Sequence, residues 1–392
     1  MKKLALLFAI LLIMTAFPSG VSWAAEKEQA ADSPDLAPNS KSAILLERDT
    51  GTILYNKNQD EVLPPASMTK IMTMLLIMEE LDRGNIKLEE TIRISENAAS
   101  MGGSQVFLEA GEEMSIQDLI KSIAIASGND ASVAMAERIS GSEEAFVKRM
   151  NEKVTELGLK NTKFQNSSGL PAANHYSTAH DMAIIAKELL RYESVTKYTS
   201  IYEDYLRKGE KNEFWLVNTN KLVKFYPDVD GLKTGFTNEA KYCLTATAKK
   251  DNMRVIAVVM GADTTKKRNA DVSKMLDYAF GHFDTKPLYQ KGETITTLKL
   301  LKAEQQLIDI QASQSISMLL KKGESAENIQ TETIIHDDIQ LPIQKGTKVG
   351  ELIIKKNNEV LSKTPLTVNE HIKSASYLTL FKRSVMQLTK NN

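Results

Sequence analysis

The sequence has little cysteine and almost no net charge, and each shortage excludes a class of protein. Cys243 is the single cysteine in 392 residues, so an intramolecular disulfide and a cysteine metal cluster are both excluded. It lies in an alternating, strand-like run over 242–248, which favours a small buried hydrophobic side chain over a catalytic thiol. The formal net charge is −1, so no positive field attracts nucleic acid, and we expect no nucleic-acid partner.

Histidine is scarce as well, and the five histidines are scattered along the chain. His175 and His180 have neither the spacing nor the glutamate of a zinc-binding helix. This pattern argues against a zinc hydrolase and against a histidine-based catalytic triad. We therefore expect no metal and no cofactor.

The N-terminus has the features of a secretory signal peptide over 1–24. Two lysines precede an almost entirely apolar run over 4–17, and the small residues Ser22, Ala24 and Ala25 lie at the spacing that predicts cleavage after Ala24 or Ala25. The apolar run is too short for a comfortable membrane span, and acidic, polar sequence follows it. These features predict an exported, extracytoplasmic protein, either secreted or attached peripherally to the outer face of the cytoplasmic membrane.

The rest of the chain has an ordinary globular composition, with 42% apolar and 25% charged residues, and is long enough for two or three domains. After about residue 286 the composition shifts to short alternating segments such as 294–298 and 350–354. We therefore expect a mixed α/β (α+β) catalytic domain over 38–285 and a small β-rich domain over 286–368.

The last segment, 370–392, is expected to be an amphipathic helix. Its apolar face would carry Tyr377, Leu378, Phe381, Val385 and Leu388, opposite Lys373, Arg383, Gln387 and Lys390. Such a helix can lie flat on an anionic membrane surface, which would make the membrane a partner. The alternative is a helix that packs on the β-rich domain or on a partner protein.

Hydrophobic periodicity predicts a hairpin, then helices, then antiparallel strands within 38–285. The expected strands cover 42–47, 52–55, 228–237, 242–248 and 254–260. Three expected helices cover 115–126, 131–139 and 143–157. Two more are expected to begin near Ser67 and near residue 178.

Ser67 and Lys70 form the first candidate site. Pro64 and Pro65 are typical of a helix start, so Ser67 is expected in the first turn and Lys70 one turn further on, on the same face. Backbone N–H groups at a helix N-terminus can stabilise an oxyanion, which makes Ser67 a candidate nucleophile and Lys70 its nearest base. Ser-x-x-Lys is a weak pattern alone, and we interpret its second copy at 194–197 as chance.

Two further short motifs follow in chain order. Ser127 and Asn129 are expected on a short loop between two helices, although such a tripeptide more often only ends a helix, and 95–97 repeats it as a helix cap. Lys233, Thr234 and Gly235 occur as a tripeptide once in the chain. The alternative for this tripeptide is a strand-edge lysine followed by a turn glycine.

In this order the three motifs resemble the active-site set of the penicillin-recognising serine acyltransferases. The signal peptide, the loop over 169–181, the β-rich domain and the terminal helix are similar, more narrowly, to the low-molecular-mass D-alanyl-D-alanine carboxypeptidases. The resemblance covers nearly the whole mature chain. It implies a β-lactamase/DD-peptidase-like fold, a peptidoglycan stem peptide as substrate and β-lactam antibiotics as covalent inhibitors.

The resemblance also implies a role for each motif. Ser67 attacks the carbonyl between two D-alanines, Lys70 accepts its proton, and Ser127 relays a proton to the leaving amine. Backbone N–H groups of Ser67 and Phe236 form the oxyanion hole. The implied catalytic residues are thus Ser67, Lys70 and Ser127, and the implied substrate-binding residues are Asn129, Lys233, Thr234, Gly235, Phe236 and Thr237, of which Lys233 and Thr234 hold the terminal carboxylate.

Lys70 can act as a base only if its pKa is far below the ordinary value. A free lysine titrates at about 10.4, so a half-neutral amine at pH ~7 needs a shift of about three pKa units, or about 4 kcal/mol. Burial and the positive charge of Lys233 both act in that direction.

Two differences from related enzymes bear on the expected activity. No Glu-x-x-Asn lies between Asn129 and Lys233, so the glutamate base of class A β-lactamases is missing, and penicillin should acylate Ser67 and leave slowly. Related enzymes can carry an arginine before the last motif that helps to bind the carboxylate; over 218–221 that contact is either missing or made by Lys221.

The expected function is removal of the terminal D-alanine from stem pentapeptides. A DD-endopeptidase or transpeptidase with the same chemistry, and a non-catalytic wall-binding scaffold, stay open as alternatives.

Overall fold

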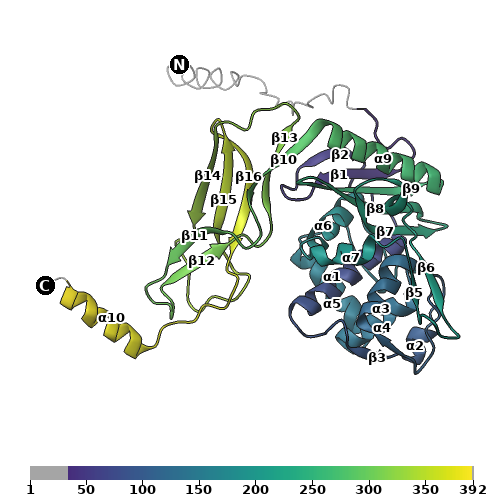
Figure 1. The fold of residues 1–392 in the computed structure, drawn as a ribbon, viewed down its shortest axis with the longest axis horizontal. Helices are drawn as coiled ribbons and strands as arrows, with labels where there is room; N and C mark the ends of the chain where they lie inside the picture. The colour runs from purple at the N-terminus through teal and green to yellow at the C-terminus, as the bar shows by residue number, and fades with distance from the viewer. Residues whose placement is uncertain (1–33, 391–392) are drawn as a thin grey trace, which may run out of the picture. The chain divides into compact units, whose positions relative to one another are not determined.

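The computed structural model describes residues 34–390, and the side chains within them up to residue 386 (Figure 1). The predicted signal peptide over 1–24 lies outside the described residues.

A five-stranded antiparallel sheet forms the centre of the first domain, in the order β2-β1-β9-β8-β7. Its strands are β1 Ser42–Glu47, β2 Ile53–Lys57, β7 Val229–Thr237, β8 Lys241–Lys250 and β9 Met253–Ala262. Strand β1 pairs with β9, so the first strand of the chain lies inside the sheet, and β7 lies at an edge. The predicted antiparallel strands are confirmed.

Helices cover both faces of this sheet. Figure 1 shows α9, Thr265–His282, on one face and α6, Ala179–Leu189, on the other. Along β1, Ala43 and Leu45 belong to the hydrophobic cluster under α9, whereas Ile44 and Leu46 belong to the cluster around α1 and α6. Because side chains alternate along a strand and both faces are covered, β1 is apolar at successive positions.

Helix α9 was not predicted. Its buried apolar residues Val272, Met275, Leu276 and Ala279 recur at helical spacing, so the sequence does contain the signal. This omission matters because Thr265 and Arg268 of α9 line a cavity together with the candidate residues Ser67 and Ser127.

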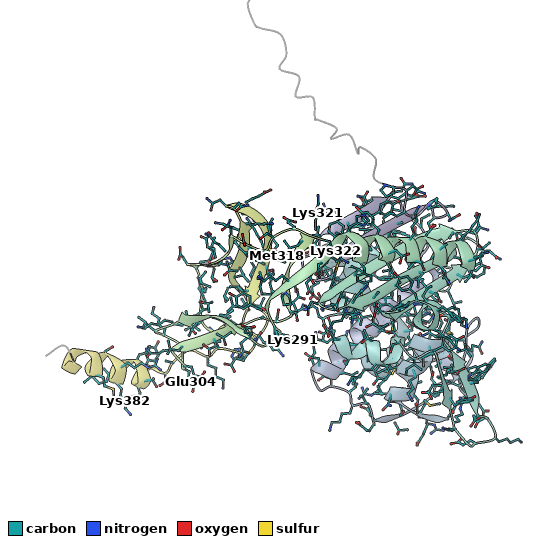
Figure 2. All side chains as sticks on the ribbon, turned by 45° about the horizontal axis from the view of Figure 1, so that its top comes forward. Lys291, Glu304, Met318, Lys321, Lys322 and Lys382 are labelled. Carbon is teal, nitrogen blue, oxygen red and sulfur yellow. The ribbon has the colours of Figure 1, made fainter. Side chains whose placement is uncertain are left out.

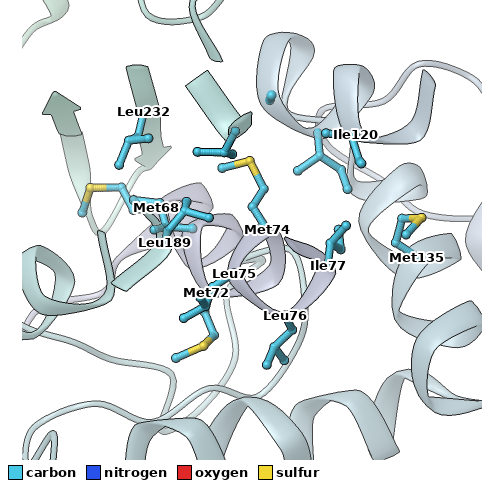
Figure 3. Close-up of a cluster of buried hydrophobic side chains, with 14 of the residues drawn as sticks. Met68, Met72, Met74, Leu75, Leu76, Ile77, Ile120, Met135, Leu189 and Leu232 are labelled. Atoms are coloured by element: carbon cyan, nitrogen blue, oxygen red, sulfur yellow. The ribbon is translucent and has the colours of Figure 1, made fainter. Parts of the chain in front are cut away.

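Helix α1, Lys70–Asp82, is buried from Lys70 through Glu80. Figure 3 shows Met72, Met74, Leu75, Leu76 and Ile77 radiating from it among side chains of neighbouring elements such as Ile120, Met135, Leu189 and Leu232. An all-round apolar helix is expected to be buried on every side, as predicted from its sequence.

The remaining helices lie between the strands of the sheet in sequence. They are α2 Glu96–Ala99, α3 Ile116–Lys121, a π-helical turn Ser122–Ala126, α4 Asn129–Ser140, α5 Glu143–Glu156, α7 Thr196–Thr199 and α8 Leu222–Phe225. The predicted helix over 115–126 is thus an α-helix that continues as a π turn. Two short hairpins complete this part: β3 Thr91–Arg93 with β4 Glu113–Ser115, and β5 Glu203–Leu206 with β6 Phe214–Val217.

A second set of strands follows α9 and surrounds a hydrophobic cluster of its own, which includes Ile310, Met318 and Leu352. The strands are β10 Phe283–Tyr289, β11 Thr294–Lys299, β12 Leu307–Gln311, β13 Ile316–Lys321, β14 Ile329–Ile335, β15 Lys348–Lys356 and β16 Glu359–Thr367. Strand β10 pairs with β13, β11 with β12, and β14, β15 and β16 form one sheet. The all-β character predicted for this region is confirmed.

The C-terminal helix, α10, covers Tyr377–Lys390. The prediction that it starts at residue 370 is wrong, because Ile372 and Ser374 make strand-like bridges to Ile343 and Ala303. Arg383 on α10 donates hydrogen bonds to the carbonyl oxygens of Leu301, Ala303 and Glu304 at 3.3, 2.8 and 2.7 Å. Figure 2 shows Glu304 and Lys382 near this junction.

Candidate active site

Ser67 lies on a single 3-10 turn, Ala66–Thr69, that leads directly into α1. Its side chain is half-buried, whereas Met68, Thr69 and Lys70 after it are buried. Two prolines fit this start because they need no N–H donor there. The turn thus holds the Ser67 hydroxyl at the surface of a rigid, apolar helix.

Lys70 is fully buried, and its Nζ donates to three oxygen atoms. The acceptors are Ser67 Oγ at 3.2 Å, Asn129 Oδ1 at 2.6 Å and the Ser168 carbonyl oxygen at 2.6 Å. The predicted common face of Ser67 and Lys70 is therefore confirmed. Ser168 was not among the predicted site residues.

Ser127 and Asn129 lie where the π turn ends and α4 begins. Ser127 has a left-handed backbone (φ 65°, ψ 33°), and its Oγ is buried with no hydrogen-bond partner among the described residues. Asn129 accepts from Lys70 and donates through Nδ2 to the Gly102 carbonyl at 2.7 Å. The second motif is thus joined directly to the first.

Lys233, Thr234 and Gly235 lie on the edge strand β7, beside the turn that carries Ser67. Lys233 is buried and donates to the Thr234 carbonyl oxygen at 3.2 Å, and Thr234 Oγ1 donates to Thr219 Oγ1 at 2.7 Å. A Cβ atom at Gly235 would stand 2.7 Å from the Pro65 carbonyl oxygen. Only glycine allows this close approach of strand and turn.

Phe236 and Thr237 continue the same strand. The Phe236 side chain is 50% exposed and stacks against Tyr242, with ring centroids 4.5 Å apart. Thr237 Oγ1 accepts a hydrogen bond from the Ala240 N–H at 2.9 Å, at the turn into β8.

A cavity of about 440 Å³ brings the motifs together. Its lining includes Ser67, Ser127, Thr234, Gly235 and Phe236 from the predicted set, together with Asn218, Thr219, Lys221 and Arg268. Ser67 and strand β7 therefore line the same cavity. Lys70 does not line it but is buried in contact with Ser67 Oγ.

Arg268 is a further site residue, besides Ser168, that sequence reasoning missed. It lies on α9, is buried, and donates through Nε and a terminal nitrogen to Asn269 Oδ1 at 3.0 and 2.8 Å. Arg268 enters the cavity from a helix that follows the segment 218–221 in sequence, and Lys221 of that segment also lines the cavity. No short motif marks Arg268, so its role emerges only when α9 is folded onto the sheet.

Burial and, after it, the charges of the site lower the pKa of both lysines. Burial, and then the positive charge of Lys233, hold the pKa of Lys70 well below its ordinary value, opposed by the negative charge of Asp130. Burial, and then the charge of Arg268, lower the pKa of Lys233 to about 7. Burial lowers the pKa of Arg268 itself to about 10. This environment therefore shifts the protonation equilibrium of Lys70 toward the neutral amine.

The other copies of the first two motifs lie elsewhere. Ser194 and Lys197 are exposed. Ser95 accepts a hydrogen bond from the Ala98 N–H at 2.9 Å and caps α2, as predicted.

Family comparison agrees with this geometry. Residues 27–264 match the family model described as D-alanyl-D-alanine carboxypeptidase. The chain belongs to this family. Over 283–374 the carboxypeptidase also matches the model described as Penicillin-binding protein 5, C-terminal domain.

Individual relatives cover nearly all of the carboxypeptidase. The D-alanyl-D-alanine carboxypeptidase DacF of Bacillus subtilis (strain 168) is 57% identical over 389 residues, which are 99% of each chain. Penicillin binding protein 5 from Haemophilus influenzae has a similar structure, with a TM-score of 0.68 and 31% identity over 87% of this chain and 99% of that one.

Penicillin-Binding Protein D2 from Listeria monocytogenes, solved in an ampicillin-bound form, also has a similar structure, with a TM-score of 0.57 and 30% identity. The match covers 63% of this chain and 100% of that one. The carboxypeptidase is therefore a serine-type, penicillin-binding enzyme with the predicted fold class.

Proposed function

We propose that the enzyme removes the terminal D-alanine of peptidoglycan stem pentapeptides through an acyl-enzyme on Ser67. The observation that carries this proposal is the 3.2 Å hydrogen bond between Lys70 Nζ and Ser67 Oγ, with Lys70 buried and its pKa lowered. A neutral lysine at this distance can take the hydroxyl proton as the oxygen attacks.

The reaction divides into two steps. In the first, Ser67 Oγ bonds to the carbonyl carbon between the two D-alanines and its proton passes to Lys70. The C–N bond then breaks, and the leaving amine of D-alanine receives a proton through Ser127, whose buried Oγ has no hydrogen-bond partner among the described residues and faces the cavity. In the second, water attacks the ester carbon and Ser67 Oγ leaves with a proton.

Substrate binding rests on β7 and on the cations around it. The backbone N–H groups of Ser67 and Phe236 stabilise the oxyanion, and Asn129 binds the peptide backbone. Thr234, Arg268 and Lys233 hold the terminal carboxylate, with Gly235 and Thr237 completing the binding strand. A β-lactam enters the same reaction, in which its ring opens and the ester on Ser67 persists.

Mass spectrometry tests the site of acylation. After treatment with benzylpenicillin, the intact protein is expected to gain the mass of one penicillin, and the proteolytic fragment that carries Ser67 should contain it. An adduct on a fragment without Ser67 would reject the proposed nucleophile.

Arg268→Gln tests the carboxylate contact. Because hydrogen bonds to a charged group contribute about 1.5–3 kcal/mol, kcat/KM for a peptide ending in D-Ala-D-Ala should fall about ten- to hundredfold. The matched substrate is the same peptide with a C-terminal amide, for which the variant and the native enzyme should differ much less. An equal loss of kcat/KM on both peptides would mean that Arg268 does not bind the terminal carboxylate.

Export and surface attachment form a second part of the proposal. Lys2 and Lys3 with the apolar run after them direct the chain across the membrane, and α10 holds the mature enzyme at its outer face. Tyr377, Leu378 and Phe381 on α10 are 93%, 75% and 69% exposed, which supports contact with lipid. Within residues 34–390, no helix has the length and apolar character needed to cross a membrane.

Vesicle binding tests the role of α10. The mature chain should sediment with phosphatidylglycerol vesicles. The double variant Leu378→Asp, Phe381→Asp should bind them about tenfold or more weakly, because each change removes apolar surface that the lipid would cover. Leu307→Asp on β12 is the control, since Leu307 is also exposed, at 65%. Equal sedimentation of all three proteins would reject membrane contact by α10.

The domain division is part of the same proposal: a signal peptide over 1–24, a catalytic domain over 38–285, a β-rich domain over 286–368 and a terminal membrane-surface segment. The two family matches, over 27–264 and 283–374, support it.

A further inference from the structure

A second cavity, of about 620 Å³, lies next to the catalytic one. One wall is the segment from Val62 to Ala66, before the nucleophile, and another is the loop from Gly169 to Tyr176. Thr237 and Glu239, at the end of β7 and in the turn after it, complete the lining.

Close contacts connect the two cavities around Ser67. Ala66 lines the second cavity and Ser67 the first, and along β7 the first ends at Phe236 where the second begins at Thr237. A Cβ atom at Gly169 would stand 1.9 Å from the Ala66 carbonyl oxygen and 2.9 Å from the Ser67 nitrogen. The loop that walls the second cavity is therefore packed directly against the nucleophile's backbone.

The direction of a bound peptide follows from the charges. Lys221 and Arg268 line the first cavity, so the terminal carboxylate of the substrate belongs there. The scissile carbonyl must then lie at Ser67, and the residues before it must leave on the other side. A peptide added along the free edge of β7 reaches Thr237 and the second cavity in this way.

The lining of the second cavity has a distinct chemistry. Apolar surface comes from Val62, Leu63, Leu170, Pro171 and the Tyr176 ring. Among the described residues that line it, Glu239 is the only carboxylate and none is lysine or arginine.

His175 adds no positive charge to this lining. Burial lowers its pKa to about 4, and its ring is held between Thr69 Oγ1 at 2.8 Å and the Gln165 N–H at 3.2 Å. An aliphatic chain that ends in an ammonium group fits such a surface, with its stem on the apolar wall and its charge at the carboxylate.

We propose that the second cavity binds the residue that precedes the D-Ala-D-Ala pair, and that Glu239 selects a long side chain with a free amine at that position. This inference rests on the proposed function, because it takes the orientation of the peptide from the acyl-enzyme on Ser67. Glu239 is a specificity residue in this scheme and takes no part in the chemical steps.

Two peptides that differ in one acetyl group provide the test. They are Nα-acetyl-L-Lys-D-Ala-D-Ala, with a free side-chain amine, and the Nα,Nε-diacetyl peptide, without one. Since a solvent-exposed ion pair contributes up to about 1 kcal/mol, the native enzyme should prefer the free amine about two- to fivefold in kcat/KM. The preference should shrink at about 1 M salt, where the Debye length is about 3 Å.

Glu239→Gln should abolish this preference without changing kcat/KM for the diacetyl peptide. The matched control is Glu61→Gln, which removes an exposed carboxylate just before Val62 and should leave the preference intact. A preference that persists in Glu239→Gln, or equal rates of the native enzyme on both peptides, would overturn the inference while D-alanine release still supports the proposed function. Release from neither peptide would instead reject the proposed function.

Discussion

Replacing Ser67 with alanine is expected to abolish D-alanine release, with a loss of about a millionfold, as for the removal of other serine nucleophiles. Among the described residues, Lys70 Nζ contacts Ser67 Oγ, Asn129 Oδ1 and the Ser168 carbonyl, and it contacts no other hydroxyl. Acylation by benzylpenicillin should disappear in parallel. The measurement is D-alanine released from a D-Ala-D-Ala peptide by the chain from Glu26 onward.

The fold should survive the Ser67→Ala change, because the side chain is small and only half-buried. An unchanged circular dichroism spectrum and melting temperature would establish this. The control is Ser194→Ala in the exposed second copy of the motif, which should keep full activity. Substantial D-alanine release by folded Ser67→Ala would mean that another group is the nucleophile.

Replacing Lys70 with methionine is expected to lower kcat/KM about a hundredfold to ten-thousandfold, which is the range for loss of a general base. Methionine has a similar length and suits the buried site, so packing around α1 should be retained. The lost donor leaves Asn129 Oδ1 and the Ser168 carbonyl without their partner, and we expect a moderate fall in melting temperature.

Lys70→Arg distinguishes a role of Lys70 as a base from a role that depends only on its positive charge. Arginine keeps a cation at this position but does not lose its proton in a protein, so it cannot accept the proton of Ser67. This variant should be as inactive as Lys70→Met. If Lys70→Arg retained most of the native kcat/KM, Lys70 would act as an electrostatic group and the proton would have another acceptor.

The parts of the site that were predictable lie close together in sequence. Ser67 and Lys70 are one turn apart, so the helix signal from two prolines and an apolar run was enough to place both side chains on one face. Likewise, alternation in β8 and the continuous apolar run in β9 predicted the strands next to the segment Lys233 to Gly235.

The other parts depend on tertiary packing. Nothing local in the sequence indicates that the Ser168 carbonyl accepts from Lys70, or that Ser127 adopts a left-handed conformation after a π turn. Arg268 reaches the cavity only because α9 packs on the sheet beneath β8 and β9. Similarly, the start of α10 was set too early because the strand-like bridge at Ile372 is made to a residue distant in sequence, Ile343.

The pairing of β1 with β9 also determines when the enzyme can fold. The Ser40 hydroxyl donates to Asp271 at 2.7 Å across 231 positions of the sequence, and β1 lies between β2 and β9. Such non-local contacts slow folding, because a long loop must close before they form. The apolar helix that carries Lys70 therefore stays without its full covering until β9 has been synthesised, and chains truncated before β9 are expected to aggregate.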